Sequence, residues 1–224
     1  MNPRLLRFGA SESPVVVIDA FTGDIERVRA IAAAMAPYPP GRNYYPGLRR
    51  LIGQRDSSAM AYVEDLLRSA ATFIGGAFEI DLFDLLEASF SMVTADPGSL
   101  TPAQRAPHFD SVNPNYIAVL HYLSDTPGTG TAFYRQRTTD IERVDETNVD
   151  RFVAAAQRES AALRGYIQGS NPAFEQIGAV EAEPDRLVIY QGCLLHSGII
   201  PPGMSFSEDP LEGRLTCNIF IMAH

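Results

Sequence analysis

The sequence predicts one α+β domain in which helical segments come first and a β sandwich or barrel follows. Its length of 224 residues fits one domain or two very small ones. Helical periodicity dominates the N-terminal part, whereas short β-rich runs bounded by Gly, Pro, Asn and Asp fill the chain from Ala88 onward. We therefore expect residues 1–87 to support a core formed by residues 88–224, with an insertion at about residues 140–172.

The N-terminal part predicts one strand and two helices. Residues 14–19, with the sequence PVVVID, are typical of a short buried strand. Apolar residues recur at helical spacing over residues 24–35, and again over residues 58–73. We expect a loop at residues 43–50, and we expect Gly75 and Gly76 to end the second helix.

The C-terminal part predicts a series of short strands. The run at residues 116–123 has the clearest pattern, because it is rich in β-forming residues and lies between turn signals. Residues 148–167 are alanine-rich and helical in period, so they are expected to form an insertion between two strands. The expected strands are residues 90–94, 116–123, 131–135, 186–190, 194–196 and 215–222.

The composition excludes several functions. A net charge of −9 argues against a nucleic-acid-binding protein and against docking on anionic membranes. All 18 basic residues are arginines, which excludes a lysine Schiff base and a phosphate-loop lysine. The N-terminal residues lack an apolar signal core, so a cytoplasmic protein is the expectation. In that compartment Cys193 and Cys217, both in apolar runs, are expected to be buried thiols.

The triplet His108-Phe109-Asp110 is the first candidate metal-binding feature. On an extended strand, residues two apart project to the same side, so His108 and Asp110 could reach one ion together. Imidazole suits iron, and a carboxylate adds the negative charge that a divalent cation favours. The alternative is a surface histidine with an acidic neighbour.

His196 closes an apolar run that begins at Leu187. In that position it would lie where a barrel opens, and there it could bind a metal. The alternative, which the sequence supports equally, is a core histidine bonded to a backbone carbonyl. Two histidines and one carboxylate would form a facial ligand set that leaves positions open for a co-substrate and oxygen.

Arg214 and Thr216 share one face of an otherwise apolar strand. An arginine that opens such a strand needs a partner, because an unpaired buried charge is costly. A bound dicarboxylate could be that partner, held by a two-pronged guanidinium contact. A protein carboxylate, or plain exposure of Arg214, is the alternative.

These features, in this order, resemble the 2-oxoglutarate/Fe(II)-dependent dioxygenases, particularly their prolyl-4-hydroxylase-like branch. The resemblance covers the chain from about Ala88 to Ile221. Residues 45–49 and 133–135 also resemble a bacterial subgroup whose members mostly lack an assigned reaction. The matching stretches are residues 107–110, 121–124, 128–135, 185–198 and 213–216.

The resemblance implies a double-stranded β-helix, that is, a cupin-like jelly roll. It implies catalytic Fe(II) held by His108, Asp110 and His196, with Arg214 binding the distal carboxylate of 2-oxoglutarate. Tyr122 is expected to hydrogen-bond the same carboxylate or, equally, to be a core aromatic. Thr216 is a weaker candidate for that site. Two departures from the branch are a longer interval between His196 and Arg214 and a Gly-Thr-Gly turn at residues 128–130.

The implied reaction is O₂-dependent hydroxylation of a C–H bond, coupled to conversion of 2-oxoglutarate to succinate and carbon dioxide. Halogenation is disfavoured because Asp110 is present, and halogenating relatives typically replace that ligand by a small residue. The expected partner is a small-molecule or peptide substrate, with no nucleic acid and no membrane. A non-catalytic jelly-roll binding protein and a cupin-like metalloenzyme without 2-oxoglutarate are the alternatives.

Substrate identity and oligomeric state do not follow from the sequence. Arg49, Tyr134 and Arg135 are candidate substrate contacts near the mouth of the site. The alternative for Tyr134 is a place in the sheet, and for both arginines it is a solvated rim, which is the favoured interpretation of Arg49. His121 alternates with apolar residues in its strand and is expected to be a core or sheet histidine.

Overall fold

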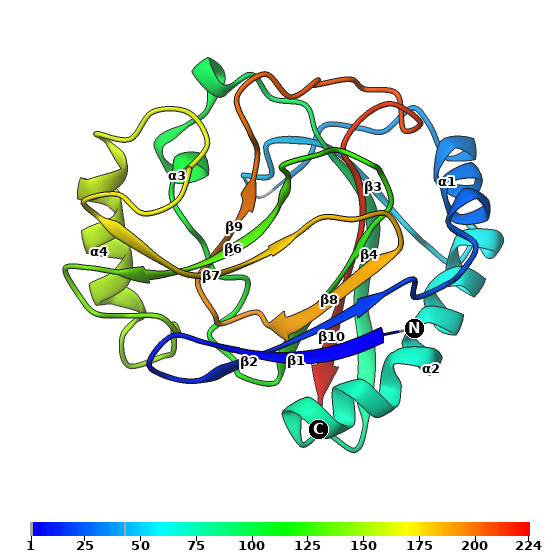
Figure 1. Ribbon diagram of the computed structural model, residues 1–224, viewed down its shortest axis with the longest axis horizontal. Coiled ribbons are helices and arrows are strands. Elements are labelled where there is room, and N and C mark those ends of the chain that lie inside the picture. Colours follow the sequence, from blue (N-terminus) through cyan, green and yellow to red (C-terminus); the bar gives the residue numbers. More distant parts are fainter. Residues whose placement is uncertain (1, 43) are drawn as a thin grey trace.

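Two antiparallel β-sheets face each other in the protein (Figure 1). The computed structural model describes residues 2–42 and 44–224. The larger sheet has the strand order β1-β2-β8-β5-β10-β4-β3, and the smaller has the order β7-β6-β9. This arrangement is the jelly-roll fold that the sequence predicts.

The strands of the larger sheet are β1 (Asn2–Phe8), β2 (Ser13–Asp19), β8 (Arg186–Gln191), β5 (Tyr116–Tyr122), β10 (Leu215–Ala223), β4 (Phe83–Val93) and β3 (Gly47–Leu51). The strands of the smaller sheet are β7 (Phe174–Glu181), β6 (Gly130–Gln136) and β9 (His196–Ile199).

Helices cover the outer face of each sheet. The helices α1 (Ile25–Ala34) and α2 (Ser57–Phe78) share a buried apolar cluster with one face of the larger sheet. The helix α4 (Val149–Ser160) packs against the smaller sheet, on the opposite side of the molecule in Figure 1. Two short helical turns, η1 (Pro97–Ser99) and α3 (Pro102–Arg105), connect β4 to β5. No helix in the described part of the chain has both the length and the apolar character that a membrane crossing requires.

The alternation of residues along β10 explains why one sheet face is core and the other lines a cavity. Leu215, Cys217, Ile219 and Ile221 point into the cluster beneath the helices. Successive side chains of a strand project to opposite faces, so Thr216, Asn218 and Phe220 point toward the smaller sheet. These three residues line a cavity between the two sheets.

The second helix continues past the residues expected to end it. The prediction that Gly75 and Gly76 stop α2 is wrong, because the helix ends at Phe78 and Glu79 follows in the left-handed conformation with φ 58°. Ile74 is fully buried, and Phe78 packs against the same core. Burial of this apolar face offsets the small helix-propensity cost of two glycines.

Three strands were not expected from the sequence, namely β1, β3 and β7. The expected loop at residues 43–50 contains most of β3, which pairs with β4 from Gly47 to Leu51. Asn43, the first residue of that expected loop, lies outside the described residues. Through β1, β2 and β3, residues 1–87 add strands directly to the larger sheet.

Candidate metal centre and its pocket

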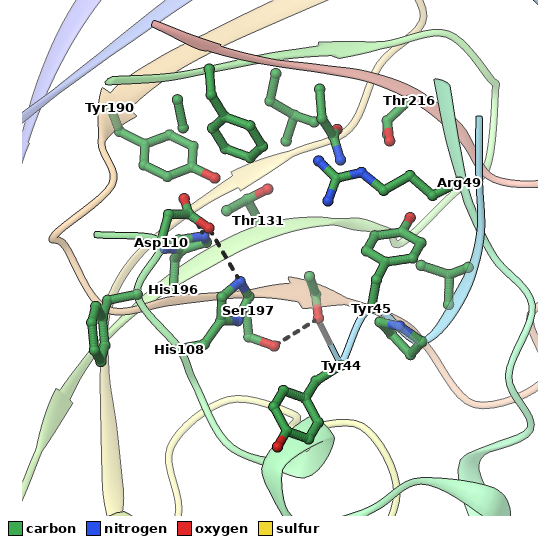
Figure 2. A pocket seen from close by; sticks show the side chains of 18 of the residues that line it. Tyr44, Tyr45, Arg49, His108, Asp110, Thr131, Tyr190, His196, Ser197 and Thr216 are labelled. Carbon is green, nitrogen blue, oxygen red and sulfur yellow. Dashed lines mark hydrogen bonds and ion pairs between the residues drawn. The ribbon is translucent and has the colours of Figure 1, made fainter. Parts of the chain in front are cut away.

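A cavity of about 670 Å³ lies between the two sheets. Its lining includes His108, Asp110 and His196. Arg49 and Arg214 also line it. Figure 2 shows the two histidines and Asp110 gathered together, with the side chain of Arg49 extending toward them across the cavity. The volume falls within the range of small-molecule binding sites.

Three donor side chains converge in this cavity. The Nε2 atom of His108 lies 3.9 Å from Oδ1 of Asp110, and Nε2 of His196 lies 3.6 Å from Oδ2 of Asp110. One ligand atom from each of the three residues can be chosen so that all lie within 4.8 Å of one another. Donors about 2.0–2.2 Å from one ion at right angles would be about 3 Å apart, so small side-chain rotations would close the set.

Backbone pairing between distant segments brings the three donors together. His108 and His196 form an isolated antiparallel bridge in which each backbone N–H donates to the carbonyl of the other at 2.9 Å. Two residues later, the backbone N–H of Asp110 donates to the carbonyl of Gly192 at 2.7 Å. The expectation of an extended segment is therefore correct locally, although the segment forms a single bridge and no regular strand.

The residue between the first two donors, Phe109, lines the cavity and also contacts the helical insertion. The ring of Phe109 meets the ring of Phe152 in α4 edge-on, with their centroids 5.7 Å apart. The helical insertion therefore packs behind the segment that carries His108 and Asp110. The regular helix of this insertion, α4, ends at Ser160, earlier than the expected limit of residue 167.

The hydrogen bonding of His196 leaves its Nε2 atom free to bind a metal. Nδ1 of His196 lies 2.8 Å from the carbonyl oxygen of Leu194, so Nδ1 carries the proton and donates it. His196 is 5% exposed, and burial lowers its pKa to about 4 despite the bond to Leu194. The ring is therefore neutral at pH 7, which is the form that binds a metal. The expected position of His196 at the end of a strand is wrong, because β9 begins there.

The electrostatics of His108 and Asp110 also suit a cation. The side chain of His108 is 56% exposed; desolvation within the cavity and the neighbouring His196 lower its pKa, against the opposing effect of Asp110. Burial raises the pKa of Asp110, although the charges of His108 and Arg49 act in the opposite direction. In the described part of the chain, Oδ2 of Asp110 is buried without a hydrogen-bond partner. A bound cation would satisfy this oxygen, so the donor set fits a divalent metal.

Arg214 is a buried cation that lacks a protein counter-ion. It is 6% exposed, and its Nη2 donates to the carbonyl of Gly130 at 3.1 Å, while Nε has no partner within residues 2–42 and 44–224. No carboxylate of the described residues lies within the 4.0 Å of an ion pair with Arg214. Residues 201–213 form a loop without strands, so the longer interval after His196 still delivers Arg214 to the cavity.

Tyr122 and Thr216, the other two residues expected at the co-substrate site, both lie near Arg214. The guanidinium carbon of Arg214 is 5.9 Å from the centroid of the Tyr122 ring. Tyr122 is 1% exposed, and its hydroxyl is 2.6 Å from the hydroxyl of Thr131, which itself lines the cavity. Thr216 lines the cavity directly. A direct role of Tyr122 in holding a carboxylate stays a prediction.

Tyr45 is a residue of this site that the sequence analysis did not single out. It lines the cavity from the turn before β3, and its hydroxyl group lies near Ser91 and Thr216. Burial raises its pKa, although Arg214 and Arg49 act in the opposite direction. The sequence shows a Tyr-Tyr-Pro-Gly stretch here, but only the pairing of β3 with β4 directs it at the cavity.

The other candidates lie in different places. The side chain of Arg49 is 17% exposed and lines the cavity, so its interpretation as a solvated rim residue is wrong. Tyr134 is buried in the core beside α4, and Arg135 pairs with Glu142 at 2.9 Å; neither lines the cavity. His121 is fully buried, as expected for a core histidine.

The chain is a jelly-roll protein whose cavity holds a His-X-Asp and His donor set. It belongs to the family described as "Family of unknown function (DUF6445)", which matches residues 1–221. No curated protein matches the chain in a sequence comparison.

Solved structures with this fold include several of the oxygenases that the resemblance predicts. HygX from Streptomyces hygroscopicus, with nickel and 2-oxoglutarate bound, is 13% identical with a TM-score of 0.56, covering 94% of this chain and 83% of that chain. The non-haem alpha-ketoglutarate-dependent epimerase SnoN from nogalamycin biosynthesis has the same identity and TM-score, with 94% and 79% covered. A prolyl hydroxylase from Trichoplax adhaerens is 13% identical with a TM-score of 0.50, with 93% and 83% covered. At this level of identity the similarity establishes the fold.

Proposed function

We propose that the protein is an Fe(II)- and 2-oxoglutarate-dependent oxygenase that hydroxylates a C–H bond of its substrate. The observation that carries this proposal is the meeting, in one cavity, of a two-histidine, one-carboxylate donor set and a buried arginine without a protein counter-ion. The first group fits a divalent metal, and the second fits the carboxylate of a co-substrate. When bound, iron and 2-oxoglutarate together with O₂ would supply the oxidising chemistry.

The residues of the chain would hold and orient these groups. His108, Asp110 and His196 would bind the metal from one side and leave the opposite positions open to the cavity. Arg214 would hold the distal carboxylate, with Thr216 beside it and Tyr122 behind it. The buried walls of the cavity would exclude water from the reaction.

The state of Arg214 favours this function over the alternatives. A metalloenzyme that uses no 2-oxoglutarate would have no need to bury an unpaired guanidinium beside the metal ligands, because such a charge costs free energy until it is neutralised. A non-catalytic binding protein would need neither the arginine nor the complete donor set. Hydroxylation, rather than halogenation, fits the presence of the Asp110 carboxylate.

Visible absorption of the anaerobic protein tests this proposal. Adding Fe(II) and 2-oxoglutarate together should produce a metal-to-ligand charge-transfer band that neither compound produces alone. The band should disappear in His108→Ala and persist in His224→Ala, a histidine paired with Asp84 outside the cavity. The absence of a band in the unmodified protein at saturating concentrations would refute the proposal.

A second variant separates the co-substrate from the metal. Arg214→Gln should keep its Fe(II) affinity but bind 2-oxoglutarate at least about tenfold more weakly, because a charge-assisted contact is lost. Unchanged 2-oxoglutarate affinity in this variant would support a metalloenzyme of the cupin type.

A further inference from the structure

A second arginine enters the cavity from β3, an edge strand of the larger sheet. Arg49 lies on β3, and Figure 2 shows its guanidinium reaching toward the side on which Asp110 lies. Arg214 enters next to β10, and both guanidinium groups line the same space.

The chain fixes the position of the Arg49 guanidinium but leaves part of it unused. Nε donates to the hydroxyl of Ser89 at 2.9 Å, and Nη2 is paired with Oε1 of Glu87 at 2.9 Å. The rings of Tyr45 and Phe220 lie 5.9 and 5.6 Å from the guanidinium carbon. Among the described residues, Nη1 finds no hydrogen-bond acceptor. This nitrogen is therefore available to a ligand.

The ion pair with Glu87 leaves Arg49 able to bind a second carboxylate. The side chain of Glu87 is 43% exposed, and pairs that involve such a solvated carboxylate contribute little. Glu87 also lines the cavity, so a carboxylate that enters it would share this guanidinium with Glu87 and bind through Nη1. Arginine suits this role because its donors match the two oxygens of a carboxylate.

An unsatisfied amide lies beside this arginine. Oδ1 of Asn218 is buried without a hydrogen-bond partner among the described residues, and Asn218 lines the cavity. Asn218 is paired in register with Ser89, the residue that holds Nε of Arg49. An amide oxygen accepts a hydrogen bond, so a ligand at Arg49 would satisfy it with a hydroxyl or amino group.

We propose that Arg49 and Asn218 form the substrate site, and that the substrate carries a carboxylate with a hydroxyl or amino group nearby. This inference rests on the proposed function, in which Arg214 is occupied by 2-oxoglutarate. The carboxylate belongs either to a small acid or to one end of a peptide, because a cavity of about 670 Å³ shared with the co-substrate admits little more.

Binding of matched acids and amides to the loaded protein tests this inference. The protein is saturated with Fe(II) and 2-oxoglutarate without oxygen, so that the co-substrate occupies its own site. Amino acids, N-acetylamino acids, 2-hydroxy acids and short peptides are then added, each beside its carboxamide. Affinity is measured by equilibrium dialysis and by the change in the visible band. At least one acid should bind about tenfold more tightly than its amide.

Two variants on the same strand make the assignment specific. Arg49→Gln should weaken binding of that acid about tenfold or more and leave the affinity for 2-oxoglutarate unchanged. Arg50→Gln is the matched control, because Arg50 is paired with Asp56 and does not line the cavity, and it should bind the acid normally. Binding by free acids alone or by peptides would distinguish the two sources of the carboxylate.

Three results would overturn the inference. The first is equal binding of acids and amides, and the second is binding of no acid in the panel. The third is loss of 2-oxoglutarate affinity in Arg49→Gln to the degree expected for Arg214→Gln, which would place Arg49 in the co-substrate site. Failure of the proposed function is a different result, because the 2-oxoglutarate-dependent band would then be absent before any acid is added.

Discussion

At the scale of single residues, the donor set depends on backbone positions as much as on the donors themselves. Asp110 is held by a hydrogen bond from its own N–H to the carbonyl of Gly192. A side chain at residue 192 would enter the space of that contact, since an added Cβ would lie 2.7 Å from Cδ1 of Tyr116 and 3.1 Å from Cβ of Asp110. Glycine at this position therefore allows the carboxylate to approach His196.

Gly192→Ala should weaken Fe(II) binding without unfolding the protein. The displaced Asp110 would meet the metal in a poorer geometry, and changes next to metal ligands typically reduce affinity about 10–100-fold. Anaerobic Fe(II) titration, followed by calorimetry, measures the effect. Ala at Gly53, where an added Cβ would contact only Oδ2 of Asp56 at 3.8 Å, is the control. Equal affinity in the two variants would contradict this role of Gly192.

At the scale of elements, the two glycines inside α2 differ in their surroundings. An added Cβ on Gly76 would meet nothing within 4 Å, whereas one on Gly75 would lie 2.9 Å from the carbonyl oxygen of Ile80. The same substitution should therefore have different effects at adjacent positions of one helix.

Gly76→Ala should raise the free energy of unfolding by about 0.5–1 kcal/mol, because alanine loses less backbone entropy in a helix. Gly75→Ala should bring no such gain, because its Cβ would force the end of the helix to shift. Urea denaturation followed by circular dichroism compares the two. If both variants gain stability equally, the close approach of Ile80 is not limiting.

The sequence predicted the elements whose burial gives them a clear pattern of apolar residues. The strands β2, β5 and β8 are almost wholly buried, so their apolar runs are evident. By contrast, β1 is an exposed edge strand without alternation, and β3 carries two arginines. Such strands are fixed by pairing with distant segments, and a single sequence does not reveal that pairing.

The same reasoning explains which residues of the site could be predicted from the sequence and which could not. His108, Asp110 and His196 were predictable because their residue types and order are unusual together. The positions of Tyr45 and Asn218 in the cavity were not predictable, and Arg49 was only one of three candidate contacts. Such residues are common, and only the register of β3, β4 and β10 directs these three into one cavity.

At the scale of the whole molecule, one buried network connects α2, β5 and the turn before α1. Nδ1 of His121 is 2.6 Å from the hydroxyl of Tyr62, and its Nε2 is 3.0 Å from Oδ1 of Asp185. Asp185 also accepts hydrogen bonds from the backbone N–H groups of Thr22 and Gly23, at 2.9 and 2.7 Å. Burial alone would raise the pKa of Asp185, but these hydrogen bonds outweigh it and lower the pKa to about 2.

This network should make stability fall in acid. Because folding lowers the pKa of Asp185, its contribution is complete above the ordinary value of about 3.8 and is lost as the pH falls toward 2. Burial also lowers the pKa of His121, so protonation below about pH 6.5 favours the unfolded chain as well. Both effects lower the free energy of unfolding as the pH falls.

Asp185→Asn should lower the free energy of unfolding at pH 7 by on the order of 2 kcal/mol and flatten its dependence on pH below 4. Asparagine tolerates the left-handed backbone found here, with φ 63°, so the effect should reflect the lost charge. Denaturant titrations between pH 3 and 7 measure it. Asp81→Asn, at an exposed position, is the control, and identical pH profiles for the two variants would contradict the assignment.

The mutual hydrogen bonds between the backbones of residues 108 and 196 have a consequence for metal capture. These bonds form when the chain folds, so two donors stand ready before any ion arrives. A metal ion at the proposed site would therefore meet donors that are already in place, and the chain would not need the ion in order to fold. Little of the free energy of metal binding would then be needed to order the polypeptide. A chelator should therefore remove the metal and leave the protein folded.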